Sequence, residues 1–205
     1  AAADGLLRGL LVDEKFAKIP RLWRLGMEIA DSRGQRMRAI ECLEHALELE
    51  YATLPDTINI EPLRNDYRRL LDHYEWLASA VNALKMDVPA DLASRTVRVA
   101  DRWRAVDPEV TDVCDRTARI MRAIGSREAR ELAWDYSTTP LALKPNESSP
   151  WLNLGNMLQR EGDLTLADDA YRAAFDAEPT NAQLLWDRAQ NLKQRGLMTE
   201  RNKVL

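Results

Sequence analysis

The feature that most constrains the fold is an alternation of large and small residues over residues 150–181. Large apolar residues recur there at spacings of three and four, which places them on one face of a helix. They are Trp151, Leu154 and Leu158. Gly155 lies beside this face and has no side chain, so we expect a second helix to approach closely at this point. The facing stripe of that second helix consists of Ala167, Tyr171 and Ala174.

Helix breakers divide and end this stretch. Gly162 and Asp163 interrupt the apolar pattern and predict a turn after the first helix. Pro179 is expected to end the second helix, because a proline ring does not fit inside a helix and restricts the residue before it. Residues 148–181 are therefore predicted to form a helical hairpin.

The hairpin pattern has a counterpart earlier in the chain. Pro145 precedes Pro179 by 34 residues, and Ala133 precedes Ala167 by the same interval. Together with Trp151 and Leu154-Gly155, this order resembles the tetratricopeptide repeat (TPR), whose unit has this length. Only the positions of Leu158 and Tyr171 depart from the TPR pattern, and both remain large and hydrophobic. The resemblance is closest over 148–181 and has fewer matches over 109–147, 182–205 and 19–53.

The TPR resemblance implies an all-α fold, a solenoid or superhelix of antiparallel helical hairpins. In this framework residues 19–58 form a degenerate hairpin, 109–147 and 148–181 form two repeats, and 182–205 form part of another. We expect residues 1–18 to be an N-terminal segment or cap with one helix. The 19–53 repeat lacks an exit proline, so its second helix is expected to continue toward Leu54-Pro55. Pro140 is expected to kink or end the second helix of the 109–147 repeat near residues 137–139.

Residues 59–108 are predicted to form a hairpin of longer helices. The first begins at about Glu61, and Pro62 suits its first turn. Its apolar residues alternate at spacings of four and three: Leu63, Tyr67, Leu70, Tyr74, Leu77, Val81 and Leu84. One interpretation is a repeat helix packed on its neighbour, which the shortness of the seam favours. The alternative is a dimerising coiled coil. The second helix is expected over 90–105.

Charge and hydropathy bear on the partners. The net charge of −4 gives no general attraction to nucleic acid or to an anionic membrane. Arginines are dense over residues 95–130, but acidic residues alternate with them, which predicts salt-bridged helix surfaces and no nucleic-acid partner. No apolar run approaches the roughly 18 residues that a membrane helix needs, so we expect no membrane insertion.

The sequence leaves the compartment unknown. Cys42 and Cys114 lie far apart and do not form a disulfide framework, which favours a reducing, cytoplasmic setting. The chain has no initiator methionine and stops within an expected helix. We therefore expect it to be part of a longer protein.

The sequence contains no pattern of a catalytic or cofactor site. It has no glycine-rich phosphate loop, no G-x-S-x-G and no H-E-x-x-H. Cys42 and His45 stand three residues apart on an expected helix, but only His73 and Cys114 are left to complete a zinc site. We therefore predict no metal, no cofactor and no enzymatic activity.

The TPR resemblance implies that the first helix of each hairpin lines a concave, peptide-binding surface. Seven residues at such positions are candidates for contact: Arg119, Arg122, Asn153, Asn156, Trp186, Gln190 and Lys193. Asparagine can both donate to and accept from a peptide backbone, arginine can grip a carboxylate, and tryptophan supplies a large apolar contact. The competing interpretation is that the asparagines are ordinary exposed residues and that Trp186 packs within its own repeat.

These observations predict a non-catalytic scaffold that binds a peptide or a partner protein as part of a larger protein. One alternative is a regulatory or substrate-recruiting arm of an enzyme whose catalytic domain lies outside this chain. The other is a homo-oligomerisation module that uses either the seam over residues 63–84 or the partial repeat at the end of the chain. TPR resemblance determines the architecture far better than the biological role.

Overall fold

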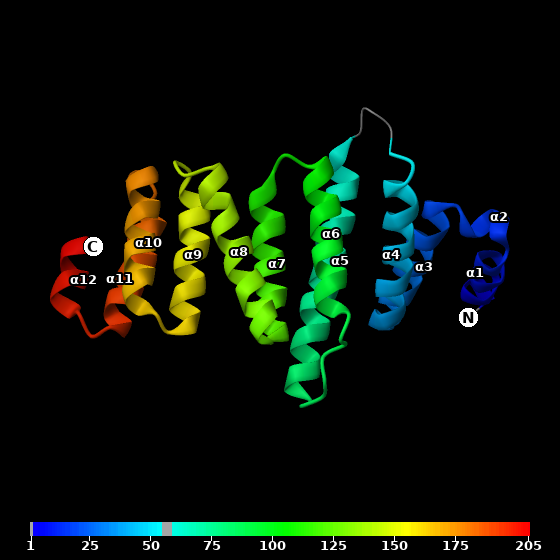
Figure 1. Cartoon of the computed structure of the whole chain (residues 1–205), viewed down its shortest axis with the longest axis horizontal. Helices are drawn as coiled ribbons and strands as arrows, with labels where there is room; N and C mark the ends of the chain where they lie inside the picture. The colour runs from blue at the N-terminus through cyan, green and yellow to red at the C-terminus, as the bar shows by residue number, and fades with distance from the viewer. Residues whose placement is uncertain (1, 55–58) are drawn as a thin grey trace. The chain divides into compact units, whose positions relative to one another are not determined.

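The structure of the chain is a computed structural model that describes residues 2–54 and 59–205 (Figure 1). The described residues form twelve helices and no strand. They divide into two compact units. The N-terminal unit comprises Ala1–Glu109 and Arg119–Ser126, and the C-terminal unit comprises Val110–Ala118 and Arg127–Leu205.

The N-terminal unit contains six complete helices. They are α1 (Ala2–Val12), α2 (Glu14–Ala17), α3 (Pro20–Ser32), α4 (Arg36–Tyr51), α5 (Ile60–Ala83) and α6 (Leu92–Val106). The expected single helix near the N-terminus is present as α1, followed by the one-turn α2. Helix α4 ends at Tyr51 instead of continuing toward residue 54; the expected continuation into Pro55 lies outside the described residues.

The apolar seam of α5 is buried within this unit. Its first five members, from Leu63 to Leu77, are at most 6% exposed, whereas Leu84 at the helix end is 70% exposed. Tyr67 stacks on Trp103 of α6 with the ring centres 5.8 Å apart. The seam therefore belongs to the packing of its own chain, which is the interpretation that the sequence favoured over a dimerising coiled coil.

Helices α3 and α4 form a closely packed hairpin. A Cβ atom at Gly26 of α3 would stand 3.1 Å from Sγ of Cys42 on α4, so the glycine permits the contact. Cys42 is consequently buried, and burial raises the pKa of its thiol. The cysteine therefore acts as a small apolar core residue.

The C-terminal unit contains the first part of α7 (Val110–Ile124) and the helices that follow. They are α8 (Arg127–Leu143), α9 (Ser148–Glu161), α10 (Leu164–Ala177), α11 (Ala182–Gln194) and α12 (Met198–Val204). The predicted close approach at Gly155 is confirmed, because a Cβ atom there would stand 2.7 Å from the ring of Tyr171. Tyr171 is 1% exposed and packs in one apolar cluster with Leu154, Met157 and Leu158.

The turns of this unit lie at the glycine and aspartate residues that predicted them. Gly162 ends α9 with a left-handed φ of 88°, a conformation that glycine adopts without a steric penalty. The side chain of Asp163 then accepts a hydrogen bond from the backbone N–H of Leu166 and caps α10. Gly196, with φ of 75°, marks the corresponding turn between α11 and α12.

Pro140 was expected to kink the second helix of the 109–147 repeat, α8, or to end it near residues 137–139, and the expectation of an early end is wrong. The helix continues through Pro140 to Leu143. Pro140 has no N–H to donate to the carbonyl of Tyr136, four residues earlier, so it removes a single bond of the helix. The hydroxyls of the preceding turn bond to other carbonyls: Ser137 Oγ donates to that of Ala133 at 2.8 Å, and Thr139 Oγ1 to that of Asp135 at 2.7 Å. Burial of Pro140 adds packing that favours the continued helix.

Three buried aspartates join neighbouring helices through arginine. Asp4 lies within ion-pair distance of Arg8, Arg33 and Arg38, from α1, the end of α3 and α4. Asp168 of α10 pairs with Arg188 at 2.7 Å and with Arg172 and Arg195 at 3.4 Å. Asp107 accepts two hydrogen bonds from Arg64 of α5, at 2.6 and 3.0 Å, and one from Nε1 of Trp103 at 2.9 Å. Each carboxylate has thus exchanged water for arginine donors.

Candidate interaction surfaces

Five of the seven candidate residues lie on two helices of the C-terminal unit. Asn153 and Asn156 are half-buried on α9, whereas α11 carries Trp186, Gln190 and Lys193. Trp186 is 49% exposed, and Lys193 is exposed as well. We call these five residues the α9/α11 set.

A buried polar network lies behind this set. The hydroxyl of Tyr171 donates to Oδ1 of Asn156 at 2.9 Å and lies 3.2 Å from Oε1 of Gln159. Nδ2 of the fully buried Asn191, on α11, donates to the same Gln159 oxygen at 3.4 Å. Burial, with a further contribution from Asp187, raises the pKa of Tyr171 to about 12, so its hydroxyl stays protonated. The network joins α9, α10 and α11 and fixes the orientation of Asn156.

The two arginines of the candidate set belong to the N-terminal unit. Arg119 donates through Nε to Glu75 of α5 at 3.3 Å. Arg122 is half-buried on α7. Five candidates thus lie on α9 and α11, two helices that the hydrogen bond between Asn191 and Gln159 joins, and their assembly into one binding surface remains a prediction.

The four residues considered as zinc ligands, Cys42, His45, His73 and Cys114, each pack against other parts of the chain or are buried. The His45 ring stacks on Trp23 at 4.5 Å, and Nε2 of His73 lies 3.5 Å from Asp31. Burial lowers the pKa of His73 despite that carboxylate. Cys42 and Cys114 are both buried. Within residues 2–54 and 59–205, no group of three or more histidine, cysteine or acidic side chains could hold a metal ion.

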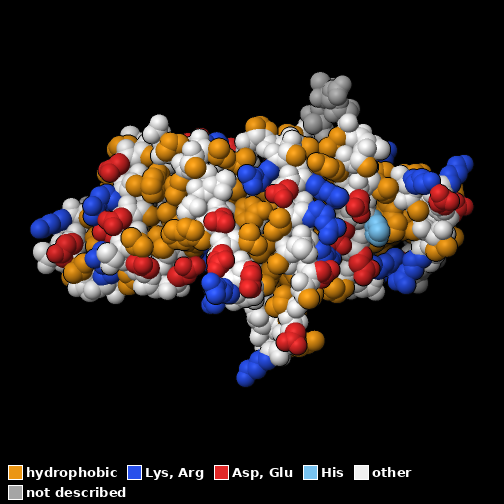
Figure 2. All heavy atoms as spheres, in the orientation of Figure 1, with side chains coloured by type: hydrophobic (Ala, Val, Ile, Leu, Met, Phe, Trp, Pro, Cys, Tyr) orange, Lys and Arg blue, Asp and Glu red, His pale blue; other side chains and the backbone are white. Residues whose placement is uncertain are grey.

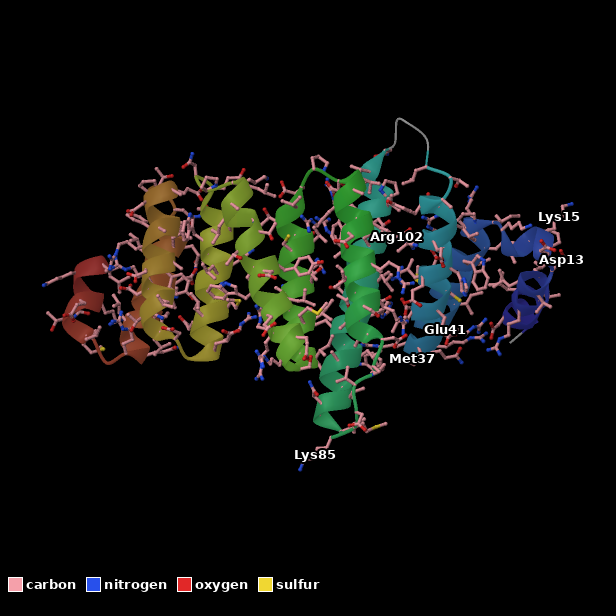
Figure 3. All side chains as sticks on the ribbon, in the orientation of Figure 1. Asp13, Lys15, Met37, Glu41, Lys85 and Arg102 are labelled. Atoms are coloured by element: carbon pink, nitrogen blue, oxygen red, sulfur yellow. The ribbon has the colours of Figure 1, made fainter. Side chains whose placement is uncertain are left out.

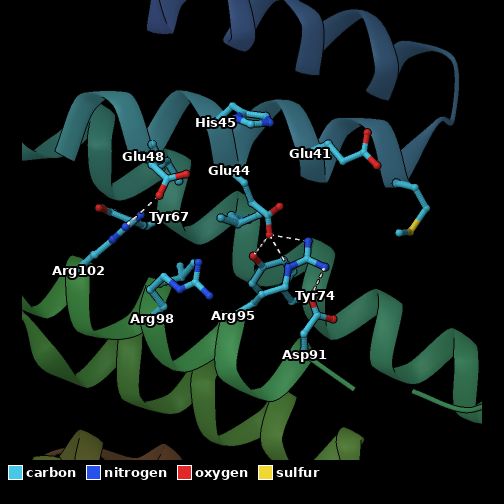
Figure 4. A pocket seen from close by; sticks show the side chains of 14 residues that line it. Glu41, Glu44, His45, Glu48, Tyr67, Tyr74, Asp91, Arg95, Arg98 and Arg102 are labelled. Atoms are coloured by element: carbon cyan, nitrogen blue, oxygen red, sulfur yellow. Dashed lines mark hydrogen bonds and ion pairs between the residues drawn. The ribbon is translucent and has the colours of Figure 1, made fainter. Parts of the chain in front are cut away.

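Sequence reasoning missed a cleft in the N-terminal unit. Residues of α4, α5 and α6 enclose a hollow of about 400 Å³ (Figure 4). We call it the α4/α6 cleft. One wall is the acidic row Glu41, Glu44 and Glu48 on α4, and the other is the basic row Arg95, Arg98 and Arg102 on α6. Tyr67, Leu70 and Tyr74 of α5 also line it. Met37, near Glu41 at one end of α4, also lines the cleft (Figure 3).

Two ion pairs connect the walls. Arg95 donates to Oε1 of Glu44 through Nε at 2.8 Å and through Nη2 at 2.5 Å, and Tyr74 donates its hydroxyl to the same carboxylate. Arg102 donates to Glu48 at 3.3 Å. Burial and the neighbouring Glu44 raise the pKa of Tyr74, so its hydroxyl remains a donor. One ion pair therefore lies on each side of Arg98, Glu44–Arg95 on one side and Glu48–Arg102 on the other.

Charges elsewhere are also mixed in sign. Figure 2 shows acidic and basic side chains interspersed on the face drawn. The arginine-dense stretch forms ion pairs, as predicted: Arg116 with Asp112 at 2.7 Å, and Arg127 with Glu131 at 3.2 Å. A search of the described residues finds no helix that is both long and apolar enough to cross a membrane.

Comparison with known proteins gives structural neighbours only. No protein-family model matches the chain, and no curated protein sequence matches it. MamA from Desulfovibrio magneticus RS-1, residues 41 to the end, is similar at a TM-score of 0.50 and 14% identity, over 90% of each chain. Two crystal structures of MamA have TM-scores of 0.49. One is 14% identical and is matched over 90% of this chain and 87% of its own. The other is 16% identical and is matched over 87% of this chain and 89% of its own.

The comparison bears on the fold. The helical content, the hairpins of both units and the likeness to the MamA structure at a TM-score of 0.50 confirm the predicted class, an all-α fold of TPR-like helical hairpins. At 14% identity the likeness extends to the fold and not to the residues of a site.

Proposed function

We propose that the chain is a non-catalytic protein-interaction scaffold that binds an extended segment of a partner protein on the α9/α11 set. The observation that carries this proposal is an exposed aromatic side chain on α11, a helix that a buried network joins to Asn156 of α9. Trp186 leaves about half of its surface in contact with solvent, and large aromatic side chains of this kind dominate binding energies in protein interfaces.

The network determines which group Asn156 offers to a partner. Its Oδ1 already accepts from Tyr171, so the group left for a ligand is the amide NH₂. An NH₂ donor matches a main-chain carbonyl of an extended peptide. Asn153 and Gln190 supply further amides, which hold a backbone without selecting side chains. Lys193 favours a carboxylate at that end of the partner segment.

The helical scaffold supports binding through rigidity. Tyr171 and Asn191, whose side chains hold α9 and α11 in place, are already buried in the unbound chain. A preformed surface has little conformational entropy to lose on binding, so more of the contact energy appears as affinity.

The test compares two tryptophans of similar exposure. Trp186 is 49% exposed on α11, and Trp134 is 46% exposed on α8, outside the α9/α11 set. Peptides are selected for binding to the wild-type chain from a random displayed library, and their affinities are measured by fluorescence anisotropy. We expect Trp186→Ala to weaken them by about thirtyfold, equivalent to about 2 kcal/mol, and Trp134→Ala to leave them unchanged.

A second variant addresses the amides. Asn153→Ala combined with Gln190→Ala leaves the Tyr171 hydrogen bonds intact, so the fold is retained and a loss of affinity reports the surface itself. Circular dichroism and thermal unfolding verify that each variant is folded. Selected peptides that bind equally to the wild type, to Trp186→Ala and to the double variant would exclude the α9/α11 set as the binding surface.

A further inference from the structure

We propose that the α4/α6 cleft is a second protein-binding site, which receives an acidic side chain of a partner segment on Arg98. This site is independent of the α9/α11 set, because all of its lining residues lie in the N-terminal unit. It is also formed differently. The two helices that carry its charged walls are the second helices of their hairpins, whereas TPR resemblance assigns peptide binding to first helices.

The three arginines of α6 differ in the contacts they make. Their spacing of three and four places them on one helix face. Arg95 is held by Glu44 and lies 5.4 Å from the Tyr74 ring centre, and Arg102 is held by Glu48. Arg98 lies between them, is exposed, and has no hydrogen-bond or ion-pair partner among the residues that the structure describes. Figure 4 shows its guanidinium group between the two ion pairs.

A buried hydroxyl provides a second, independent observation. Tyr67 lines the cleft and is 1% exposed, yet its hydroxyl has no hydrogen-bond partner within the described part of the chain. In Figure 4 the hydroxyl lies at the end of the cleft beside the Glu48–Arg102 pair. A buried, unsatisfied hydroxyl raises the free energy of the unbound protein, and a ligand oxygen that accepts from it removes this penalty. The cleft therefore contains two unused donors, a guanidinium and a hydroxyl.

The opposite wall determines which acceptor fits. Three glutamates follow α4 along the cleft, and Glu41 is exposed without a partner in the described residues. Arg95 and Arg102 offset the charges of Glu44 and Glu48, so Glu41 is the carboxylate that would repel a chain of phosphates bound along the cleft. A protein segment instead places one carboxylate near Arg98 and can offer a cationic side chain to Glu41. We therefore assign the cleft to a segment of mixed charge, and not to RNA or DNA.

The test uses a fluorescein-labelled peptide in which glutamate, leucine and lysine alternate. A matched peptide has glutamine in place of every glutamate. Binding to the whole chain is followed by fluorescence anisotropy at low ionic strength, where charged contacts are least screened. The variants are Arg98→Ala and Tyr67→Phe. The control is Arg104→Ala, which removes an arginine of the same helix that does not line the cleft.

We expect the wild type and Arg104→Ala to bind the glutamate peptide equally. Arg98→Ala should weaken binding about tenfold or more, because a charge-assisted hydrogen bond is lost. Tyr67→Phe should weaken binding by about threefold without lowering the melting temperature, since the hydroxyl has no hydrogen-bond partner among the described residues of the free protein.

Three outcomes would overturn the proposal. The first is no saturable binding of the glutamate peptide to the wild type, and the second is equal binding of the glutamine peptide. The third is tighter binding of a uridine RNA oligomer with the same dependence on Arg98, which would assign the cleft to nucleic acid. None of these outcomes depends on the α9/α11 set, so the two sites are tested separately.

Discussion

Gly155→Ala is expected to destabilise the C-terminal unit, although alanine is the better helix former. The added Cβ atom would stand 2.7 and 2.8 Å from two ring carbons of Tyr171. The shorter of these distances is about 0.8 Å below the roughly 3.5 Å at which carbon atoms make favourable contact. The ring cannot move away easily, because it is 1% exposed and its hydroxyl is bonded to Asn156.

The magnitude follows from two opposing contributions. Overpacking of a rigid core costs about 1–3 kcal/mol. Replacing glycine by alanine inside a helix returns about 0.5–1 kcal/mol. The overlap at Gly155 is with several ring atoms at once, so we place its cost at the upper end and expect a net loss of about 2 kcal/mol. For a chain of this size that corresponds to a melting temperature lower by about 4–8 °C.

Urea unfolding followed by circular dichroism measures this difference in the free energy of unfolding. Gly9→Ala is the matched control, since Gly9 lies inside α1 with no atom within 4 Å of the new Cβ position. The control should be stabilised by about 0.5–1 kcal/mol. Adding Tyr171→Leu should remove much of the effect of Gly155→Ala. A Gly155→Ala protein as stable as the wild type would refute the reasoning that the hairpin depends on this contact.

Three further predictions concern buried charge and backbone strain. Burial tends to raise the pKa of Asp107, but the hydrogen bonds from Arg64, Trp103 and the Glu109 backbone outweigh it and lower the pKa to about 2. Because this pKa is depressed on folding, the contribution to stability is present above about pH 4 and is lost as the pH falls toward 2; screening of the partly exposed Arg64 limits it to about 1–2 kcal/mol. Asp107→Asn should flatten this part of the acid-unfolding curve, and an unchanged curve would contradict the assignment. Asp168→Asn should cost about 2 kcal/mol in urea unfolding, because Arg188 loses its 2.7 Å carboxylate partner; no measurable loss would show the cluster to be energetically neutral. Lys85→Gly should raise stability by about 1 kcal/mol in thermal unfolding, since Lys85, at the end of α5 (Figure 3), has a left-handed φ of 55°, and a loss would argue against strain there.

The parts of the fold that the sequence predicted rest on short-range signals. Gly155 and Tyr171 belong to one hairpin, and their spacing is readable because the repeat places them at fixed positions. Gly162 and Gly196 mark turns because a left-handed φ favours glycine wherever it occurs. Each of these signals lies within a few turns of the residue it affects.

The helix that continues through Pro140 shows the limit of such short-range signals. Proline removes one helical hydrogen bond, here the bond to the carbonyl of Tyr136, and the helix continues where packing of the buried proline offsets that loss. The hydroxyls of the preceding turn, from Ser137, Thr138 and Thr139, bond to the carbonyls of Ala133, Trp134 and Asp135. Their sequence is visible, but their rotamers depend on the packing around the buried proline, which a single sequence does not reveal.

The α4/α6 cleft was missed for a different reason. Its walls are joined by pairs separated by more than 50 residues, Glu44 with Arg95 and Glu48 with Arg102. In the sequence each row has the pattern of a solvated helix face. Only the packing of α4 and α6 against α5 shows that the rows face each other and that Arg98 has no ion-pair partner within residues 2–54 and 59–205. The α9/α11 set could be proposed because repeat positions align; its polar network behind Asn156 could not.

The buried aspartates have a consequence for how such chains could be rearranged. Asp4 and Asp168 each take arginine donors from the hairpin that follows them, so each of these two junctions requires a partner of opposite charge. Moving the hairpin that carries Asp168 would separate this buried carboxylate from Arg188, and loss of such a partner costs several kcal/mol. Asp107 would keep Arg64, because both belong to the α5/α6 hairpin. Apolar surfaces alone would tolerate many orders of assembly. Ion pairs between neighbouring hairpins therefore favour the order of hairpins found in this chain. Variants with rearranged hairpins should fold only where each buried aspartate keeps an arginine on the adjoining helix.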